Sequence, residues 1–175
     1  GGSIKYSEDD ILATDRGDDP YNHSYINWAN EVYKPTYITQ HTLNLTGGSE
    51  VGRYLVSFDY LDQPGLVKNT EYQRYSYRVN TDLNIGKMLK VSSDVTYRHV
   101  DRLWPESLGS VQYDVWSMQP TSPVRYENGD YRLDKQNRNA ISLMDLDVVG
   151  EDRYNMDVVY GQLKADFEPI KDLVF

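Results

Sequence analysis

Hydrophobic and polar residues alternate strictly along Arg53–Asn80, and this alternation predicts two β-strands joined by a polar loop. On the first strand, the apolar side chains of one face are Tyr54, Val56, Phe58 and Tyr60. On the second strand, which continues to Ile85, they are Tyr75, Tyr77, Val79, Leu83 and Ile85. Because successive side chains of a strand point to opposite faces, each strand has one apolar and one polar face. This pattern suits a wall between lipid and water better than the core of a soluble protein.

The same alternation recurs along the rest of the chain. The predicted strands are about Tyr37–Thr46, Arg53–Asp62, Tyr72–Ile85, Leu89–Asp101 and Asn155–Glu168, and Leu173-Val174-Phe175 begins a sixth. Short turns, such as Gly47–Glu50 and Gly86-Lys87, alternate with long connections, so all short turns fall at one end of the predicted sheet. Outer-membrane barrels have short periplasmic turns and long extracellular loops. The predicted fold class is therefore all-β, an antiparallel up-and-down meander that is a fragment of a large outer-membrane β-barrel.

This architecture divides the chain into two parts. Residues 1–36 are predicted to be an acidic extracellular loop segment with a short helix at about Tyr25–Tyr33, which ends before Pro35. Residues 37–175 are predicted to hold the barrel strands. Within them, residues 62–71 and 102–154 are the long extracellular loops, and the short connections are the periplasmic turns.

Composition narrows the classes of function. The mean hydropathy is −0.69 and the formal net charge is −9. No run approaches the roughly 18 to 20 apolar residues of a spanning helix, which leaves membrane strands open. The acidic balance argues against nucleic acid as a partner. Cysteine is absent, which excludes disulfides and thiol nucleophiles. The start, Gly1-Gly2-Ser3, has no basic or apolar region, so we expect no signal peptide and, if the protein is exported, a mature or excised piece.

Aromatic usage is lopsided, with 16 Tyr against 3 Phe and 3 Trp. A buried phenol needs a hydrogen-bond partner, so Tyr is favoured where one end of the ring is apolar and the other is wet. Membrane interfaces and sugar-binding surfaces both have this character. The composition therefore points to one of these two kinds of surface.

Several short motifs resemble the SusC/RagA family of TonB-dependent outer-membrane transporters of Bacteroidetes-type bacteria. The motifs are Gly47-Gly48-Ser49-Glu50, Arg53-Tyr54, Tyr60-Leu61-Asp62-Gln63-Pro64-Gly65, Asn69-Thr70, Tyr72 and Arg74-Tyr75-Ser76, preceded by Asp18-Asp19-Pro20-Tyr21-Asn22 and Asn27-Trp28. The resemblance is strong over about Asp18–Arg102 and looser to the end of the chain.

This resemblance implies a bacterial outer-membrane location and a barrel of about 22 strands, plugged by an N-terminal domain. It also implies a SusD-like surface lipoprotein as partner, energy from the TonB system, contact with outer-membrane lipid, and import of glycans or peptides. The chain departs from the family pattern because it lacks the plug, a TonB-contacting segment and the closing strands. We therefore expect that it does not transport anything alone.

Two sets of residues are candidates for functional surfaces. Polar side chains on one face of the third and fourth strands either line a hydrated lumen or form cross-strand ion pairs, which contribute about 0.2–1 kcal/mol each. They are Arg74, Arg78, Asp82, Asp94 and Arg98, together with Lys90. Aromatic residues assigned to the second long loop either contact substrate by stacking on sugar rings or pack the loop onto the barrel mouth or a capping partner. They are Trp104, Tyr113, Trp116, Tyr126 and Tyr131.

Catalysis and metal binding have no motif behind them. No pair of acids stands out as a glycosidase pair, since Asp145 and Asp147, or Asp9 and Asp10, are typical solvated charges. The loop Arg16–Asp19 is rich in oxygen ligands but lacks the spacing of a calcium loop. The histidines are not spaced as metal ligands, and His41 and His99 fall on apolar strand faces, which favours a position near lipid headgroups. We expect no enzyme activity, no metal and no cofactor.

A second reading is a soluble β-sandwich carbohydrate-binding module, which is also typically rich in Tyr and acidic residues. A sandwich buries the apolar face of each sheet against a second sheet of the same chain. Five strands with one apolar face each leave no strands to cover them, and an open sheet has two unpaired edges. The two readings differ in what the apolar face of the sheet contacts.

Overall fold

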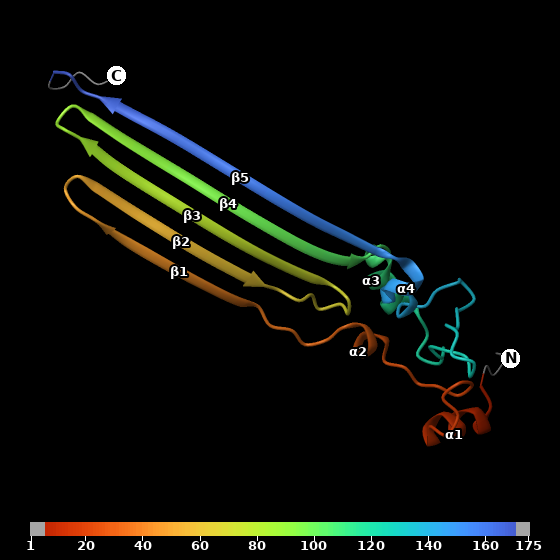
Figure 1. Cartoon of the computed structure of the whole chain (residues 1–175). Helices are drawn as coiled ribbons and strands as arrows, with labels where there is room; N and C mark the ends of the chain where they lie inside the picture. Colours follow the sequence, from red (N-terminus) through yellow and green to blue (C-terminus); the bar gives the residue numbers. More distant parts are fainter. Residues whose placement is uncertain (1–5, 171–175) are drawn as a thin grey trace. The chain divides into compact units, whose positions relative to one another are not determined.

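The computed structural model describes residues 6–170, which form two compact units (Figure 1). Among these residues, the sheet unit comprises residues 37–64, 71–102 and 153–170. The loop unit comprises residues 6–36, 65–70 and 103–152. The predicted sixth strand at residues 173–175 lies outside the described residues. Among residues 6–170, no helix is both long and apolar enough to cross a membrane.

Five strands form one antiparallel sheet in the order β1-β2-β3-β4-β5 (Figure 1). They are β1 (Thr39–Gly48), β2 (Gly52–Asp62), β3 (Glu71–Ile85), β4 (Leu89–Pro105) and β5 (Glu151–Phe167). Every strand lies beside its sequence neighbours, so the sheet is an up-and-down meander, as predicted. The described residues form this one sheet and no second sheet, so the sandwich reading is wrong.

The alternating pattern fixes the register of the first three strands. Leu43 of β1 lies opposite Phe58 of β2, and Phe58 lies opposite Tyr77 of β3. A shift by one residue would exchange the apolar and polar faces of a whole strand, so this register keeps the apolar side chains together. The large apolar side chains of this face are solvent-exposed, for example Leu45 at 56% and Leu163 at 76%.

The turn between β1 and β2 explains one motif of the family resemblance. Gly47 lies opposite Tyr54, and the Tyr54 ring crosses the space where a Cβ atom of residue 47 would be. A Cβ there would lie 2.5 Å from the Tyr54 hydroxyl oxygen, so any other residue would displace the ring. Glycine at position 47 therefore lets a tyrosine ring cover the neighbouring strand.

Two strands are longer than the sequence pattern predicts. β4 continues to Pro105 rather than Asp101, and β5 begins at Glu151 rather than Asn155. Arg102 and Tyr154 explain the extension, because the guanidinium of Arg102 lies 5.2 Å from the centre of the Tyr154 ring. An ion pair of 3.8 Å between Arg153 and Asp101 supports the same stretch.

The long connections fold into the loop unit, which has its own hydrophobic core. Its helices are α1 (Glu8–Arg16), α2 (Trp28–Val32), α3 (Leu108–Ser117), the 3-10 helix η1 (Ser142–Met144) and α4 (Leu146–Val149). Residues 8–16 and 108–117, predicted as loop, are helical. The buried core consists of Trp28, Val32, Val111, Val115, Met118, Ala140 and Met144. A region predicted to be irregular is therefore packed and ordered by apolar burial.

Asn139 connects the backbone at the centre of the loop unit, where its side chain is almost fully buried. Its Nδ2 donates to the carbonyl oxygens of Val124 (2.8 Å) and Arg132 (3.0 Å). Its Oδ1 accepts from the backbone N–H groups of Ile141 (3.0 Å) and Ser142 (3.2 Å). One amide thus satisfies four backbone groups that burial would otherwise leave without water.

Candidate functional site

A row of aromatic rings crosses the apolar face of the sheet from β1 to β4. The centroids of His41 and Tyr60 lie 6.4 Å apart, those of Tyr60 and Tyr75 4.9 Å, and those of Tyr75 and His99 6.3 Å. A second row next to it joins Phe58, Tyr77 and Tyr97, with separations of 5.1 and 6.1 Å. Aromatic rings in this arrangement mark the boundary between lipid tails and headgroups in outer-membrane barrels.

The aromatic rows end at an acidic residue of β5. The Tyr97 hydroxyl donates to Oδ1 of Asp157 at 2.7 Å, and Nδ1 of His99 lies at the same distance from the same oxygen. A carboxylate on an apolar face needs such partners, because lipid tails offer it none. The position of His99 near lipid headgroups stays a prediction.

The opposite face of the sheet carries ion pairs between neighbouring strands. Arg74 lies 3.0 Å from Asp59 of β2, Arg78 pairs with Asp94 of β4, and Lys90 lies 3.6 Å from Asp82. Arg98 is exposed on the same face. Four of the five predicted polar residues therefore take part in cross-strand ion pairs, which was one of the two alternatives for this face: Arg74, Arg78, Asp82 and Asp94. The other alternative, that they line a hydrated lumen, stays a prediction. The same face has a polar hollow of about 340 Å³ that reaches Gln162 and Lys164 of β5.

The five aromatic residues predicted to lie in the second long loop belong to three different elements: β4, α3 and a small hairpin. Trp104 lies in β4 rather than in a loop, because the strand continues to Pro105. Tyr113 and Trp116 lie one turn apart on α3 and are 68% and 75% exposed. On the other side of the same helix, Val111 and Val115 are buried in the core of the loop unit. α3 therefore presents two aromatic side chains to water.

Tyr126 and Tyr131 lie on a small hairpin closed by the pairing of Arg125 with Tyr131. The Tyr131 hydroxyl donates to Asp145 at 2.6 Å, and the Arg125 guanidinium lies 3.8 Å from the ring centre. Burial, with the hydrogen bond to Asp145, raises the pKa of Tyr131 to about 12. The Arg132 guanidinium lies 5.5 Å from the Tyr126 ring. Tyr131 is thus held by its own loop, whereas Tyr126 is about half exposed.

Asp114, on the buried side of α3, has no side-chain hydrogen bond among the described residues. Asp114 is 5% exposed, and burial raises the pKa of its carboxyl group against the opposing charge of Arg138. Arg138 itself pairs with Asp134 at 2.6 Å. Burial acts to raise the pKa of Asp134 as well, but hydrogen bonds from Arg138 and the backbone lower it overall. Arg138 therefore serves mainly to close its own turn.

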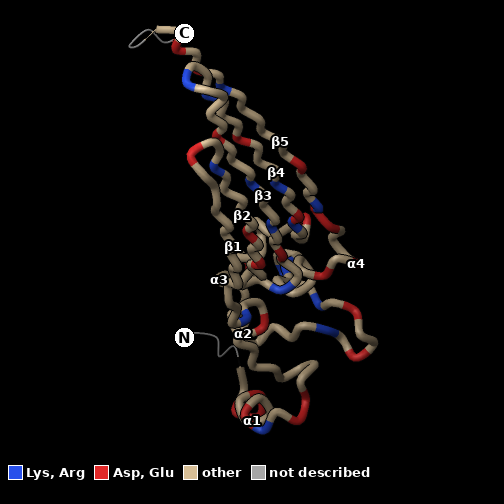
Figure 2. The backbone as a smooth tube through the Cα atoms, turned by 60° about the vertical axis from the view of Figure 1, so that its left-hand side comes forward, with Lys and Arg blue, Asp and Glu red and all other residues tan. Residues whose placement is uncertain are grey.

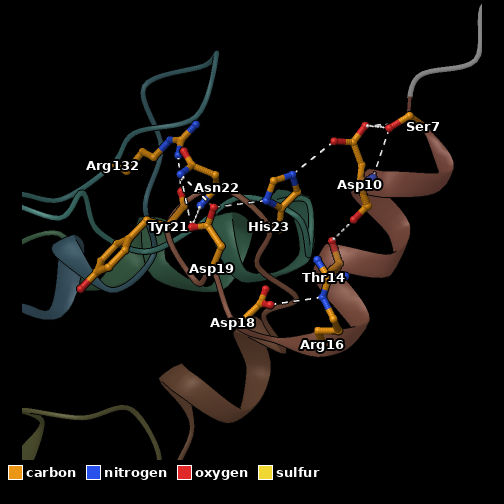
Figure 3. A network of polar contacts seen from close by, with 10 residues as sticks. All are labelled: Ser7, Asp10, Thr14, Arg16, Asp18, Asp19, Tyr21, Asn22, His23 and Arg132. Carbon is orange, nitrogen blue, oxygen red and sulfur yellow. Dashed lines mark hydrogen bonds and ion pairs between the residues drawn. The ribbon is translucent and has the colours of Figure 1, made fainter.

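A polar network connects α1 to the segment that follows it (Figure 3). His23 lies between two carboxylates, with Nε2 3.2 Å from Oδ1 of Asp10 and Nδ1 3.3 Å from Oδ2 of Asp19. Hydrogen bonds raise the pKa of His23, and the bond to Asp10 contributes more than the bond to Asp19. Figure 3 also shows Arg132, whose guanidinium donates to the Tyr21 carbonyl oxygen at 2.6 Å. Within residues 6–170, no group of three acidic or histidine side chains is placed to hold a metal ion.

Sequence comparison finds relatives of known type. The chain is 30% identical over 114 residues to TonB-dependent receptor P26 of Formosa agariphila, a match that covers 65% of this chain and 11% of that receptor. It is 31% identical over 81 residues to TonB-dependent receptor P3 of the same organism, which covers 43% of this chain and 8% of the receptor. The chain thus spans about a tenth of the length of these relatives. No family model matches the chain.

Structure comparison agrees with the sequence relatives. The fold is similar to the structure of the RagAB peptide transporter, with a TM-score of 0.65 and 22% identity over 99% of this chain and 22% of that chain. The RagAB peptide importer in the closed-closed state gives a TM-score of 0.62 and 24% identity over 86% of this chain and 18% of that chain. The chain is therefore similar in sequence to TonB-dependent receptors and similar in fold to the RagAB peptide transporter.

These similarities agree with the predicted resemblance to SusC/RagA-like TonB-dependent receptors and confirm the predicted fold class. The meander corresponds to a fragment of an outer-membrane β-barrel transporter, as its alternating strands predicted. Sequence reasoning missed the core of the loop unit. For α1, the signal was present as Ser7 three residues before Asp10, followed by Gly17 at the other end of the helix.

Proposed function

We propose that this chain forms part of the wall and outward-facing loops of a TonB-dependent transporter in the bacterial outer membrane. The proposal rests on the sheet unit, which has one exposed apolar face crossed by aromatic rows and one polar face with ion pairs. A wall between lipid and a hydrated lumen requires this combination. In this role the short turns face the periplasm, and the loop unit faces the cell exterior.

The finer parts of the proposal follow from the relatives. A peptide transporter and importer named RagAB shares the fold, which supports a role in import of peptides or glycans and a SusD-like lipoprotein as partner. In the whole receptor, about 22 strands close the barrel, and a plug domain connects it to the TonB system. We propose no catalytic activity, because the relatives are receptors.

Within this role, the predicted site residues receive specific tasks. Tyr113 and Trp116 are the loop aromatics best placed to contact substrate, because they are the most exposed of the five. Tyr126 is next in exposure, whereas Trp104 and Tyr131 mainly support the surrounding structure. Arg74, Arg78, Asp82, Asp94 and Arg98 line the lumen side of the wall.

The absence of native cysteine in the chain permits a direct test of the wall. Single cysteines carrying a nitroxide spin label are placed in the full-length receptor, with any cysteines elsewhere removed, in lipid nanodiscs. Labels at Leu45, Val79 and Val95 should collide mainly with oxygen, which concentrates in lipid. Labels at Asn44, Asn80 and Thr96 should collide mainly with a water-soluble nickel chelate. Equal accessibility at adjacent positions would contradict the proposal.

Substrate contact by α3 requires a separate test. We expect that replacing Tyr113 and Trp116 together by alanine lowers uptake about tenfold, which corresponds to a loss of about 1.4 kcal/mol. Growth on a panel of glycans and peptides as sole nutrient measures uptake. Gln112→Ala is the matched control, since Gln112 is exposed on the same helix. Loss of uptake in the control as well would assign the effect to folding of α3.

Recovery of a surface lipoprotein with the tagged receptor tests the proposed partner.

A further inference from the structure

The helix α1 is well formed at both ends but buries no side chain. Ser7 caps its first turn by accepting from the Asp10 backbone N–H at 3.1 Å, and Asp10 accepts from the Ser7 backbone N–H at 2.8 Å. Gly17 ends the helix in the left-handed region, with φ of 67°. A short helix is normally stabilised by packing of an apolar face, and α1 has no buried residue to supply it.

The connections of α1 to neighbouring segments are polar. Asp10 is joined to His23 (Figure 3). Just before the helix, the Tyr6 hydroxyl lies 3.0 Å from Oγ1 of Thr121. These contacts hold the helix in place without covering its apolar residues. Ile11 remains 60% exposed and Leu12 54% exposed.

A groove of about 520 Å³ lies beside α1, and we call it the α1 groove. Its walls are Tyr6, Asp10, Ile11, Thr14, Asp15, Tyr25 and Thr121. Tyr25 is 75% exposed, so two large apolar side chains, Ile11 and Tyr25, face water across the groove. Exposed apolar surface gathered in a concave site is typical of binding sites for partners.

The chain in and around α1, beside the α1 groove, is strongly acidic (Figure 2). Residues 6–19 contain six acidic residues and one basic residue, Arg16, which pairs with Asp18. Among the described residues, no ion pair involves Glu8, Asp9 or Asp15. The groove therefore combines an apolar floor with the carboxylate of Asp15, for which residues 6–170 provide no ion-pair partner.

We propose that the α1 groove binds a segment of a partner protein in which an apolar side chain is flanked by lysine or arginine residues. The apolar side chain enters between Ile11 and Tyr25, and the flanking cations approach Asp10 and Asp15, the two carboxylates that line the groove. This inference goes beyond the proposed import role, because it concerns an interaction surface and does not require transport.

The charge of the groove selects this occupant over others. A second copy of the chain carries a net charge of −9 and is repelled by the acidic chain beside the groove. Anionic lipid headgroups are repelled for the same reason. A basic, apolar protein segment matches both the acidic surroundings and the apolar floor, and its cations also accelerate association.

The test uses the full-length receptor in detergent and fluorescein-labelled synthetic peptides. The probe peptide has the sequence Lys-Lys-Leu-Phe-Lys-Lys, and two comparison peptides replace either the lysines by glutamate or the apolar pair by serine. We expect fluorescence anisotropy to detect binding of the probe alone, weakened as salt rises from 50 to 500 mM. Ile11→Ala should weaken binding on the order of tenfold, and Asp15→Asn by about threefold.

Two matched controls come from the same helix. Leu12→Ala removes an apolar side chain of similar size and exposure that does not line the groove, and Asp9→Asn removes a carboxylate that does not line it. Both should leave binding unchanged. Equal losses in Ile11→Ala and Leu12→Ala, or equal binding of the glutamate peptide, would overturn the proposal. Absence of binding at millimolar concentrations of the probe would also overturn the proposal for the groove. That result would leave the proposed function untouched, because the spin-label experiment tests it separately.

Discussion

The indole Nε1–H of Trp28 donates to the backbone carbonyl oxygen of Gln119 at 3.0 Å, across 91 residues of sequence. Next to it, the Ile26 N–H donates to the Pro120 carbonyl oxygen at 2.7 Å. Trp28 is 3% exposed in the core of the loop unit. The segment before the first strand is thus held to the connection between β4 and β5 by both a hydrogen bond and apolar packing.

Truncation of Trp28 should destabilise the loop unit. Trp28→Ala leaves a cavity in a packed core, and we expect a loss of about 3–5 kcal/mol. Trp28→Phe keeps most of the apolar area but removes the hydrogen bond, which costs about 1–2 kcal/mol. Pulse proteolysis of the receptor, with cleavage mapped to residues 103–152, measures the effect. Equal resistance of the wild type and Trp28→Ala would show that the core does not hold the loops together.

Replacement of Asn139 should be almost as costly. Asn139→Ala leaves the buried N–H groups of Ile141 and Ser142 without their acceptor, and we expect a loss of about 2–3 kcal/mol. Asn128→Ala is the control, because Asn128 makes comparable turn contacts with Asp130 at the surface. Thermal unfolding of the loop unit, followed by the same proteolysis, should separate the two variants. A similar small change in both would contradict the role of Asn139.

The attachment of α1 should depend on pH through His23. The raised pKa of His23 stabilises the contact fully below its ordinary value of 6.5, and this contribution is lost as pH rises through the folded value. Hydrogen bonds from Ser7 lower the pKa of Asp10, and hydrogen bonds from Asn22 lower that of Asp19. Their contributions are present above the ordinary value of 3.8 and are lost as pH falls.

Protection of α1 is therefore expected to be greatest between these two values. Hydrogen–deuterium exchange of residues 6–25, corrected for the intrinsic effect of pH, measures it. His23→Gln keeps hydrogen-bonding capacity but does not titrate near neutrality, so its profile should lack the loss at higher pH. A wild-type profile that matches the variant would show that His23 does not control the helix.

A new charge should destabilise the barrel much more on the apolar face of β4 than on its polar face. Val95 lies on the apolar face, and Val95→Lys is expected to cost about 2–4 kcal/mol near the middle of the bilayer. Thr96→Lys places the same charge on the polar face near Asp94, and we expect a change below about 1 kcal/mol. Heat-modifiable gel migration in a urea series measures barrel stability. Similar stability of both variants would be incompatible with the lipid-facing assignment.

The strands were predictable because each one shows an alternation of apolar and polar residues within its own sequence. Period-two alternation in Tyr54–Tyr60 and Tyr75–Val79 is local, and the register follows from keeping apolar side chains on one face. Strand ends were less predictable, since the extension of β4 to Pro105 depends on neighbours such as Tyr154 that lie far along the chain.

The loop unit was not predictable because its core is assembled from distant segments. Trp28, Val111 and Met144 come from three regions, and none of these regions alone is apolar enough to indicate burial. The acidic residues of α1 and the prolines on either side of α3 suggested loops. Tyr113 and Trp116 were identified as candidates from their type, but their exposure follows from Val111 and Val115 taking the buried side of the helix.

The contact between Trp28 and Gln119 also constrains the order of folding. The pairings of β1 with β2 and of β2 with β3 join residues close in sequence, so closing those hairpins costs little chain entropy. The loop unit has high contact order, because its first segment must wait for residues beyond β4. We therefore expect the hairpins to form first, and in an outer-membrane protein we expect the loop unit to cross the bilayer as an open chain and to acquire its core on the far side.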